Sequence, residues 1–295
     1  MNKTIVVGDN LAKKLSRCLR AKYSPTEDRI FPDGELQPRL LKEQPAKVSI
    51  LILRKKRNET INDYLIKFFL LSRKLKDISK KVIGIMPYFA YARQDKIFRK
   101  GEPFSVKYIA ELIEKNIDIF ITIDSHEHRI KNRQLFSIPV FNLSVFKLLA
   151  KKFKEFKLKN TLVVGPDKES KKHVDDFVEI FKSQYLIFIK KRNLSTGKIR
   201  HLVPKKLDLK NKNLIIVDDI ISSGGTIIEI IKLAKKFGAK TISLAFVHGV
   251  LVGNAVEKLK KLKPLKMIST NTIENPFEAV DVVPELARFL KNKIL

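Results

Sequence analysis

Two adjacent carboxylates, Asp218 and Asp219, stand just before a run of hydroxyl-bearing and glycine residues. They follow the β-branched segment 214–217, which is typical of a buried parallel strand. The run itself is Ser222, Ser223, Gly224, Gly225 and Thr226. The apolar positions after it, Ile227, Ile230, Ile231 and Ala234, follow helical spacing. With Gly238 as a stop, the pattern predicts a strand whose loop leads into a helix N-terminus.

Such a loop suits a phosphorylated sugar. Small residues let the backbone approach a ligand closely, and the N–H groups and dipole of a helix N-terminus favour a dianion. Carboxylates repel phosphate but accept hydrogen bonds from hydroxyl groups, so Asp218 and Asp219 are expected to face a sugar diol. An isolated Gly-Gly would favour an ordinary turn between strand and helix. The complete ordered string favours a phosphate cradle beside a sugar-binding pair.

Length and composition limit the class of protein. The chain has 295 residues, of which 44% are hydrophobic, enough for two ordinary domains with a substantial core. Its apolar runs are shorter than the roughly twenty residues that span a bilayer, and no hydrophobic signal precedes the strand-like segment 4–7. The single cysteine, Cys18, excludes an intrachain disulfide and a thiolate metal site. We expect a cytoplasmic protein with no membrane segment and with Cys18 in the core.

The formal net charge of +29 raises the question of a nucleic-acid partner. Lys and Arg are spread through both halves, without zinc-finger spacing, an aromatic RNA-binding signature or a basic tail. We therefore expect no specific nucleic-acid module. A lysine-rich solvated surface, from high growth temperature or from general composition, explains the charge and would steer anionic small substrates.

Apolar segments alternate with helical patterns along the chain, which is the signature of parallel α/β architecture. Strands are predicted at 48–53, 82–86, 118–123, 161–164, 185–189, 214–217 and 241–247. Helices are predicted to be capped near Asn62 and at Ser105. The repeated plan predicts two packed α/β domains, 1–147 and 148–295, each with a mostly parallel central sheet flanked by helices. The last helix is expected to pack back on the first domain.

Four further motifs make the chain resemble the ribose-phosphate diphosphokinases, also called phosphoribosyl-diphosphate synthetases, over almost its whole length. They are FPDGE at 31–35, PYFAYARQD at 87–95, DSH at 124–126 and VGNA at 252–255. PYFAYARQD is highly specific for this family, which has phosphoribosyltransferase-like domains. Such enzymes transfer the diphosphoryl group of ATP to the C1 hydroxyl of ribose 5-phosphate for nucleotide biosynthesis, and they require Mg²⁺. The resemblance implies the same fold, reaction and cofactor here.

The resemblance also implies a role for individual residues. The ATP site would be lined by Arg93, Gln94 and His126 and, from a neighbouring subunit of a homo-oligomer, by Phe31, Asp33 and Glu35. The magnesium ligands would be His126 and Asp167. The ribose 5-phosphate site would be the cradle, Ser222 to Thr226, with Asp218 and Asp219. On physical grounds alone, the aromatic residues of 87–95 suit base stacking and Arg93 suits phosphate, but a core cluster beside a surface ion pair is the favoured explanation.

Lys190 and Arg192 follow a predicted strand and precede a loop at 195–197. A chain this rich in lysine contains basic triplets by chance, so their composition is uninformative. In the family, a basic pair in this loop closes over the triphosphate, which implies that Lys190 and Arg192 are catalytic. Where the family often has an acidic residue, this chain has Ile189, so Lys191 is an alternative to Lys190.

Two other functions share part of this pattern. A phosphoribosyltransferase would have the cradle but usually only one α/β core, which leaves the half with PYFAYARQD unexplained. A non-catalytic regulatory homologue of the synthetase would bind nucleotides and assemble with active subunits. The presence of Asp218, Asp219, His126, Asp167, Lys190 and Arg192 argues against that alternative.

Overall fold

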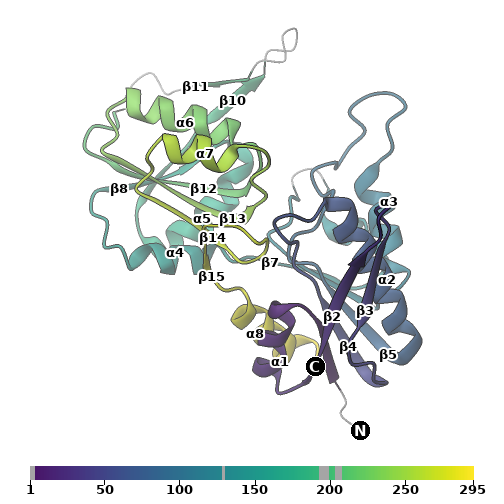
Figure 1. Cartoon of the computed structure of the whole chain (residues 1–295). Helices are drawn as coiled ribbons and strands as arrows, with labels where there is room; N and C mark the ends of the chain where they lie inside the picture. The colour runs from purple at the N-terminus through teal and green to yellow at the C-terminus, as the bar shows by residue number, and fades with distance from the viewer. Residues whose placement is uncertain (1–3, 128–129, 193–198, 203–207) are drawn as a thin grey trace. The chain divides into compact units, whose positions relative to one another are not determined.

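The computed structural model describes residues 4–127, 130–192, 199–202 and 208–295. Its internal contacts divide the chain into two compact units. Unit 1 comprises Met1–Leu143, Thr272–Glu274 and Val282–Leu295, and unit 2 comprises Ser144–Asn271 and Asn275–Asp281. Each unit has a mostly parallel sheet with helices packed on it (Figure 1). The predicted α/β class is therefore confirmed.

The sheet of unit 1 has seven strands in the order β3-β2-β1-β4-β5-β6-β7. The strands are β1 (Thr4–Gly8), β2 (Lys22–Ile30), β3 (Leu36–Leu40), β4 (Ala46–Ile52), β5 (Ser79–Ile85), β6 (Ile119–Ile123) and β7 (Val140–Leu143). The helices are α1 (Asn10–Leu19), α2 (Ile61–Ile78), α3 (Ser105–Glu114) and α8 (Val283–Lys293), with a short 3-10 helix η1 (Asn132–Gln134). Neighbouring strands are parallel except β2 and β3, which form an antiparallel hairpin. The last helix, α8, packs against α1.

The sheet of unit 2 has six parallel strands in the order β15-β14-β13-β12-β8-β9. The strands are β8 (Thr161–Gly165), β9 (Gln184–Ile187), β12 (Asn213–Ile221), β13 (Thr241–Gly249), β14 (Lys266–Thr270) and β15 (Glu278–Val280). A separate antiparallel pair consists of β10 (Ile189–Arg192) and β11 (Ile199–Leu202). The helices are α4 (Phe146–Lys154), α5 (Lys171–Phe181), α6 (Gly225–Lys236) and α7 (Ala255–Lys261), with a 3-10 helix η2 (Lys168–Ser170).

The two sheets have one topology. The spatial order β2-β1-β4-β5-β6-β7 in unit 1 corresponds to β9-β8-β12-β13-β14-β15 in unit 2, and the chain visits the strands in the same sequence. An antiparallel hairpin also occurs at the same stage, as β2–β3 in unit 1 and as β10–β11 in unit 2. The similar plan predicted for the two halves is thus present strand by strand.

Helix α6 shows how apolar spacing determines local packing. Its buried positions are Ile227, Ile230, Ile231 and Ala234, as the periodicity predicted. They pack in one core cluster with Leu214 and Ile216 of β12. Gly238 follows the C-cap residue Phe237 and has a φ of 82°, a left-handed conformation that glycine adopts without steric cost. The predicted end of this helix is therefore confirmed.

Two predicted helix starts differ from the structure. The N-cap of α2 is Thr60, whose hydroxyl accepts a hydrogen bond from the backbone N–H of Asp63 at 3.0 Å. Asn62 therefore lies inside the helix. The N-cap of α3 is Phe104, and Ser105 is the first helical residue. Asn and Ser are common N-cap residues, so residue type alone misplaced both boundaries.

Two other expectations need correction, and one element was not predicted. Strand β12 extends beyond the predicted 214–217, because β13 continues to pair with it as far as Ile221. Cys18 is exposed on α1 and is not a core residue. The hairpin β2–β3 was not predicted, because its prolines and charged residues weaken the strand pattern. The structure accommodates these residues at the edge of the sheet.

No helix in the described ranges is long and apolar enough to cross a bilayer.

Candidate active site

Strand β12 carries Asp218 and Asp219 beyond the end of its neighbour β8. The last paired position of β8 is Val164, opposite Ile216, whereas β13 remains paired with β12 as far as Ile221. The two aspartates therefore occupy a stretch of strand with a paired neighbour on one side only. They lie at the carboxyl edge of the sheet, where open α/β sheets bind ligands.

Three carboxylates create a strong negative field at this edge. The backbone N–H of Asp219 donates to Asp218 Oδ1 at 3.1 Å, and Asp219 is only 5% exposed. Burial, followed by the negative charges of Asp219 and Asp167, raises the pKa of Asp218 well above its ordinary value. Hydroxyl donors or a cation would relieve this repulsion, whereas a phosphate would increase it.

The loop after β12 ends at the N-terminus of α6. Gly224 is the N-cap and has a φ of 77°, and no side chain caps the helix. A Cβ atom on the exposed Gly225 would meet nothing closer than Ser223 Oγ, at 3.8 Å. The first N–H groups of an α-helix have no partner within the helix. The uncapped and open N-terminus of α6 therefore has the chemistry of a phosphate site.

The VGNA motif supports this loop from its other side. The backbone N–H of Leu251 donates to Ile221 O at 3.0 Å, and that of Val252 donates to Ser222 O at 3.2 Å. Because these bonds use carbonyl groups of the loop, they leave its N–H groups available to an anion. The motif at 252–255 thus has a structural relation to the cradle that its spacing in the sequence did not reveal.

Asp167 follows β8 and begins the 3-10 helix η2. Its Oδ1 accepts hydrogen bonds from the backbone N–H groups of Glu169 at 3.1 Å and Ser170 at 3.2 Å. The preceding Gly165 allows close packing at this turn, because a Cβ atom there would lie 2.2 Å from Ser170 Oγ and would force the side chain to move. Since these bonds use Oδ1, a cation or its water would be met by the second oxygen, Oδ2.

In unit 1, the predicted ATP residues lie in the loops after two neighbouring strands. Arg93 and Gln94 are exposed in the loop after β5, and His126 is half-buried in the loop after β6. The backbone N–H of Ile123 donates to Pro87 O at 3.2 Å, which joins the beginnings of these loops. The carboxyl edge of the sheet therefore brings the two loops together, as expected for parallel strands.

Residues 31–35 form the turn of the β2–β3 hairpin. The backbone N–H of Gly34 donates to Phe31 O at 2.9 Å, and that of Glu35 donates to Asp33 Oδ1 at 3.1 Å. The guanidinium of Arg29 lies 4.5 Å from the centroid of the Phe31 ring. Asp33 and Glu35 are exposed, so their side chains remain available to another molecule.

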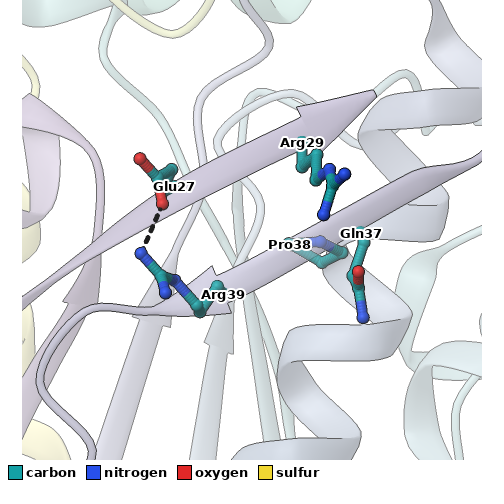
Figure 2. A pocket seen from close by; sticks show the side chains of 5 residues that line it. All are labelled: Glu27, Arg29, Gln37, Pro38 and Arg39. Carbon is teal, nitrogen blue, oxygen red and sulfur yellow. Dashed lines mark hydrogen bonds and ion pairs between the residues drawn. The ribbon is translucent and has the colours of Figure 1, made fainter. Parts of the chain in front are cut away.

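One face of the same hairpin carries a hollow of about 450 Å³ that the sequence did not predict (Figure 2). Its lining residues are Glu27, Arg29, Gln37, Pro38 and Arg39. Arg39 pairs with Glu27 at 2.7 Å. On the opposite face of β2, Asp28 contacts the buried Lys67 of α2 at 3.1 Å, and Lys67 also contacts Glu59. This ion-pair cluster anchors the hairpin to α2.

The predicted catalytic residues lie on β10. The backbone of Lys190 pairs with that of His201, and the backbone of Arg192 pairs with that of Ile199. The loop predicted at 195–197 lies outside the described residues. Lys190 and Arg192 therefore begin an antiparallel hairpin that follows β9, on the strand side of the predicted loop.

The two predicted magnesium ligands, His126 and Asp167, belong to different units. Within the described ranges, no three His, Cys, Asp or Glu side chains are grouped to hold a metal. Mg²⁺ commonly uses one or two protein ligands together with waters and substrate phosphates. The oxygen donor of Asp167 fits that mode of binding.

Comparison with known proteins covers both units. The model of the phosphoribosyl transferase domain matches residues 131–285, and the model of the N-terminal domain of ribose phosphate pyrophosphokinase matches residues 5–116. The ribose-phosphate pyrophosphokinase of Methanopyrus kandleri is 31% identical over 97% of this chain and 96% of its own length. That of Pyrococcus furiosus is 32% identical over 97% and 100%. The crystal structure of phosphoribosylpyrophosphate synthetase from Mycobacterium smegmatis matches with a TM-score of 0.83 and 25% identity, covering 98% of both chains.

Proposed function

The chain belongs to the ribose-phosphate pyrophosphokinase family, and we propose that it transfers the diphosphoryl group of ATP to the C1 hydroxyl of ribose 5-phosphate. The products are 5-phosphoribosyl 1-diphosphate and AMP, and we infer that the reaction serves nucleotide biosynthesis in the cytoplasm. The proposal rests on one observation. The buried carboxylates Asp218 and Asp219 directly precede a loop that ends at the uncapped N-terminus of α6. The match over both units argues against a phosphoribosyltransferase with a single core.

Ribose 5-phosphate binds in unit 2. Its phosphate accepts hydrogen bonds from the N–H groups at the start of α6 and from the hydroxyl groups of Ser222, Ser223 and Thr226. Its diol donates to Asp218 and Asp219, which lie before the loop and prefer hydroxyl donors to a second anion. The sugar is thereby held at both ends, which limits the directions in which its C1 hydroxyl can point.

ATP binds to residues of unit 1 and of a neighbouring subunit. Arg93 presents a planar guanidinium to phosphate oxygens, and Gln94 and His126 add hydrogen-bonding groups. Phe31, Asp33 and Glu35 reach the adenine from the hairpin of a second copy. Their place on an exposed turn supports this assignment, because the turn can extend into another molecule. The active form is therefore a homo-oligomer.

The transfer needs no covalent enzyme intermediate. The C1 oxygen attacks the β-phosphorus of ATP, the bond from that phosphorus to the α-phosphate oxygen breaks, and AMP leaves. The C1 hydroxyl loses its proton to solvent water as the new P–O bond forms. Lys190 and Arg192 stabilise the charge that develops toward AMP, so positioning and electrostatics supply the rate enhancement.

His126 and Asp167 are the proposed protein contacts of magnesium and its waters. When bound with ATP, Mg²⁺ would supply positive charge that offsets the charge of the phosphate oxygens. Asp167 would contribute through Oδ2, because its Oδ1 accepts hydrogen bonds from the backbone of η2.

A product assay tests the proposed function. Purified full-length protein is incubated with MgCl₂, ATP and ribose 5-phosphate, and AMP, ADP and 5-phosphoribosyl 1-diphosphate are quantified separately. Equal formation of AMP and 5-phosphoribosyl 1-diphosphate is expected. Formation of ADP would indicate single-phosphoryl transfer and contradict the proposal. Binding of both substrates without turnover would favour the non-catalytic regulatory homologue.

A further inference from the structure

The first turn of α2 contacts residues 87–95 at two points. Tyr91 Oη donates a hydrogen bond to Asn62 Oδ1 at 2.9 Å, across 29 positions of sequence. Tyr64 Oη donates to Leu53 O at 3.0 Å and lies 3.4 Å from Tyr88 O. Tyr64 is fully buried, so its hydroxyl links the segments that follow β4 and β5 inside the core. Neither contact belongs to the binding or transfer steps described above.

Tyr91 begins the tight turn that presents Arg93 and Gln94. The backbone N–H of Gln94 donates to Tyr91 O at 2.8 Å, which closes the turn. Tyr91 has a φ of 65°, a left-handed conformation that is unfavourable for a side chain of this size and must be supported by its surroundings. Ala92 and Asp95 are buried, whereas Arg93 and Gln94 are exposed. The orientation of the turn therefore determines where the two exposed side chains point.

Asn62 is not needed to begin α2. The helix has its own N-cap in Thr60, which accepts a hydrogen bond from Asp63 N at 3.0 Å. Asn62 lies one residue inside the helix and directs its carbonyl oxygen to the Tyr91 hydroxyl. The contact thus supports the turn rather than the helix.

We propose that Asn62 and Tyr91 are positioning residues that hold the turn 91–94 so that Arg93 and Gln94 meet ATP. The inference rests on the proposed function of this turn as part of the ATP site. It predicts a specific kinetic signature. Loss of the hydrogen bond raises the KM for ATP and leaves the KM for ribose 5-phosphate unchanged, because the cradle belongs to unit 2.

The size of the effect follows from the contact. A neutral hydrogen bond contributes about 1 kcal/mol, which corresponds to about a fivefold change in affinity. Tyr91→Phe and Asn62→Ala should therefore each raise the KM and the dissociation constant for ATP about fivefold. The double variant should show the same increase as either single variant, because both changes remove one interaction.

Asn62→Asp is the conservative rescue variant. A carboxylate oxygen also accepts a hydrogen bond from the Tyr91 hydroxyl, and an acidic residue is favourable in the first turn of a helix. This variant should retain an ATP dissociation constant close to that of the wild type. Tyr108→Phe is the matched control, because Tyr108 is 51% exposed on α3 and has no role in the turn.

The experiment measures kcat, both KM values, the dissociation constant for ATP by equilibrium dialysis, and Tm for the wild type and all variants. We expect equal fivefold losses of ATP affinity in the single and double variants, rescue by Asn62→Asp, and a fall in Tm of no more than about 4 °C. Additive losses, unchanged ATP binding in Tyr91→Phe, or a lower Tm with both KM values raised would overturn the positioning role. If the wild type binds ATP without turnover, the synthetase function fails, while dialysis still tests the positioning pair. If the wild type does not bind ATP, both proposals fail.

Discussion

Asp167 follows β8, Asp218 lies in the adjacent strand β12 beyond the last residue that pairs with β8, and the negative charges of the two side chains repel each other. Burial makes the largest contribution to the raised pKa of Asp218, and the charges of Asp219 and Asp167 raise it further. A group with a raised folded-state pKa of this kind opposes folding whenever it is ionised in the unfolded chain. The raised pKa of Asp218 therefore lowers the stability of the fold at the sheet edge where the sugar diol is proposed to bind.

Asp218→Asn should stabilise the ligand-free protein at neutral pH and abolish activity. An acid with a raised folded-state pKa destabilises the fold increasingly as pH rises above its unfolded value of about 3.9. The amide removes this cost, so we expect Tm at pH 7 to rise by about 2 °C or more, with a smaller gain near pH 4. Thermal unfolding as a function of pH measures the effect. The exposed Glu257→Gln is the control, and a Tm gain for Asp218→Asn that is independent of pH would contradict this explanation.

The two glycines of the cradle should respond differently to alanine. Gly224→Ala places a side chain at a φ of 77° and should cost about 1–2 kcal/mol of unfolding free energy. Gly225→Ala meets no atom closer than 3.8 Å, so stability should be maintained. Its methyl group lies at the open helix end, where the phosphate is proposed to bind, so the KM for ribose 5-phosphate should rise roughly tenfold. Denaturant titration and initial rates test both effects, and an unchanged KM in Gly225→Ala would exclude phosphate from this end of the helix.

Lys190→Ala should lower kcat about a hundredfold or more with little change in either KM, as expected for a contact made in the transition state. Lys191→Ala is the matched variant, since it removes the same charge from the adjacent position of β10. Steady-state kinetics of both variants assign the role. If Lys191→Ala loses turnover and Lys190→Ala does not, the catalytic assignment moves to Lys191.

A shared ATP site predicts complementation between defective subunits. Phe31→Ala would remove the proposed adenine contact that a subunit gives to its neighbour, whereas Lys190→Ala would damage the proposed site of the subunit itself. Co-expression of the two variants in equal amounts, followed by purification of all oligomers through one shared tag, should restore about a quarter of the sites, because half of the subunits keep Lys190 and half of their neighbours keep Phe31. Activity no greater than the average of the two pure variants would indicate that each site is built within one subunit.

Local sequence was sufficient to predict the class of fold and the order of the cradle. Apolar spacing between neighbouring residues predicted the first part of β12 and the buried face of α6. The backbone preference of glycine predicted the end of α6 at Gly238. These signals act over a few positions and can be read without knowing the tertiary partners. The same reasoning could not predict the β2–β3 hairpin, because pairing at a sheet edge overrides its weak strand propensity.

The tertiary structure decided which distant residues meet. It placed Asp167 within electrostatic reach of Asp218, braced the cradle with Leu251 and Val252, and joined Tyr91 to Asn62. None of these relations has a local signal, since each depends on strand order and on the register with which helices and loops close over the sheet. The sequence by itself thus determined the chemical groups and the elements that carry them, whereas packing of the sheets determined which groups act together.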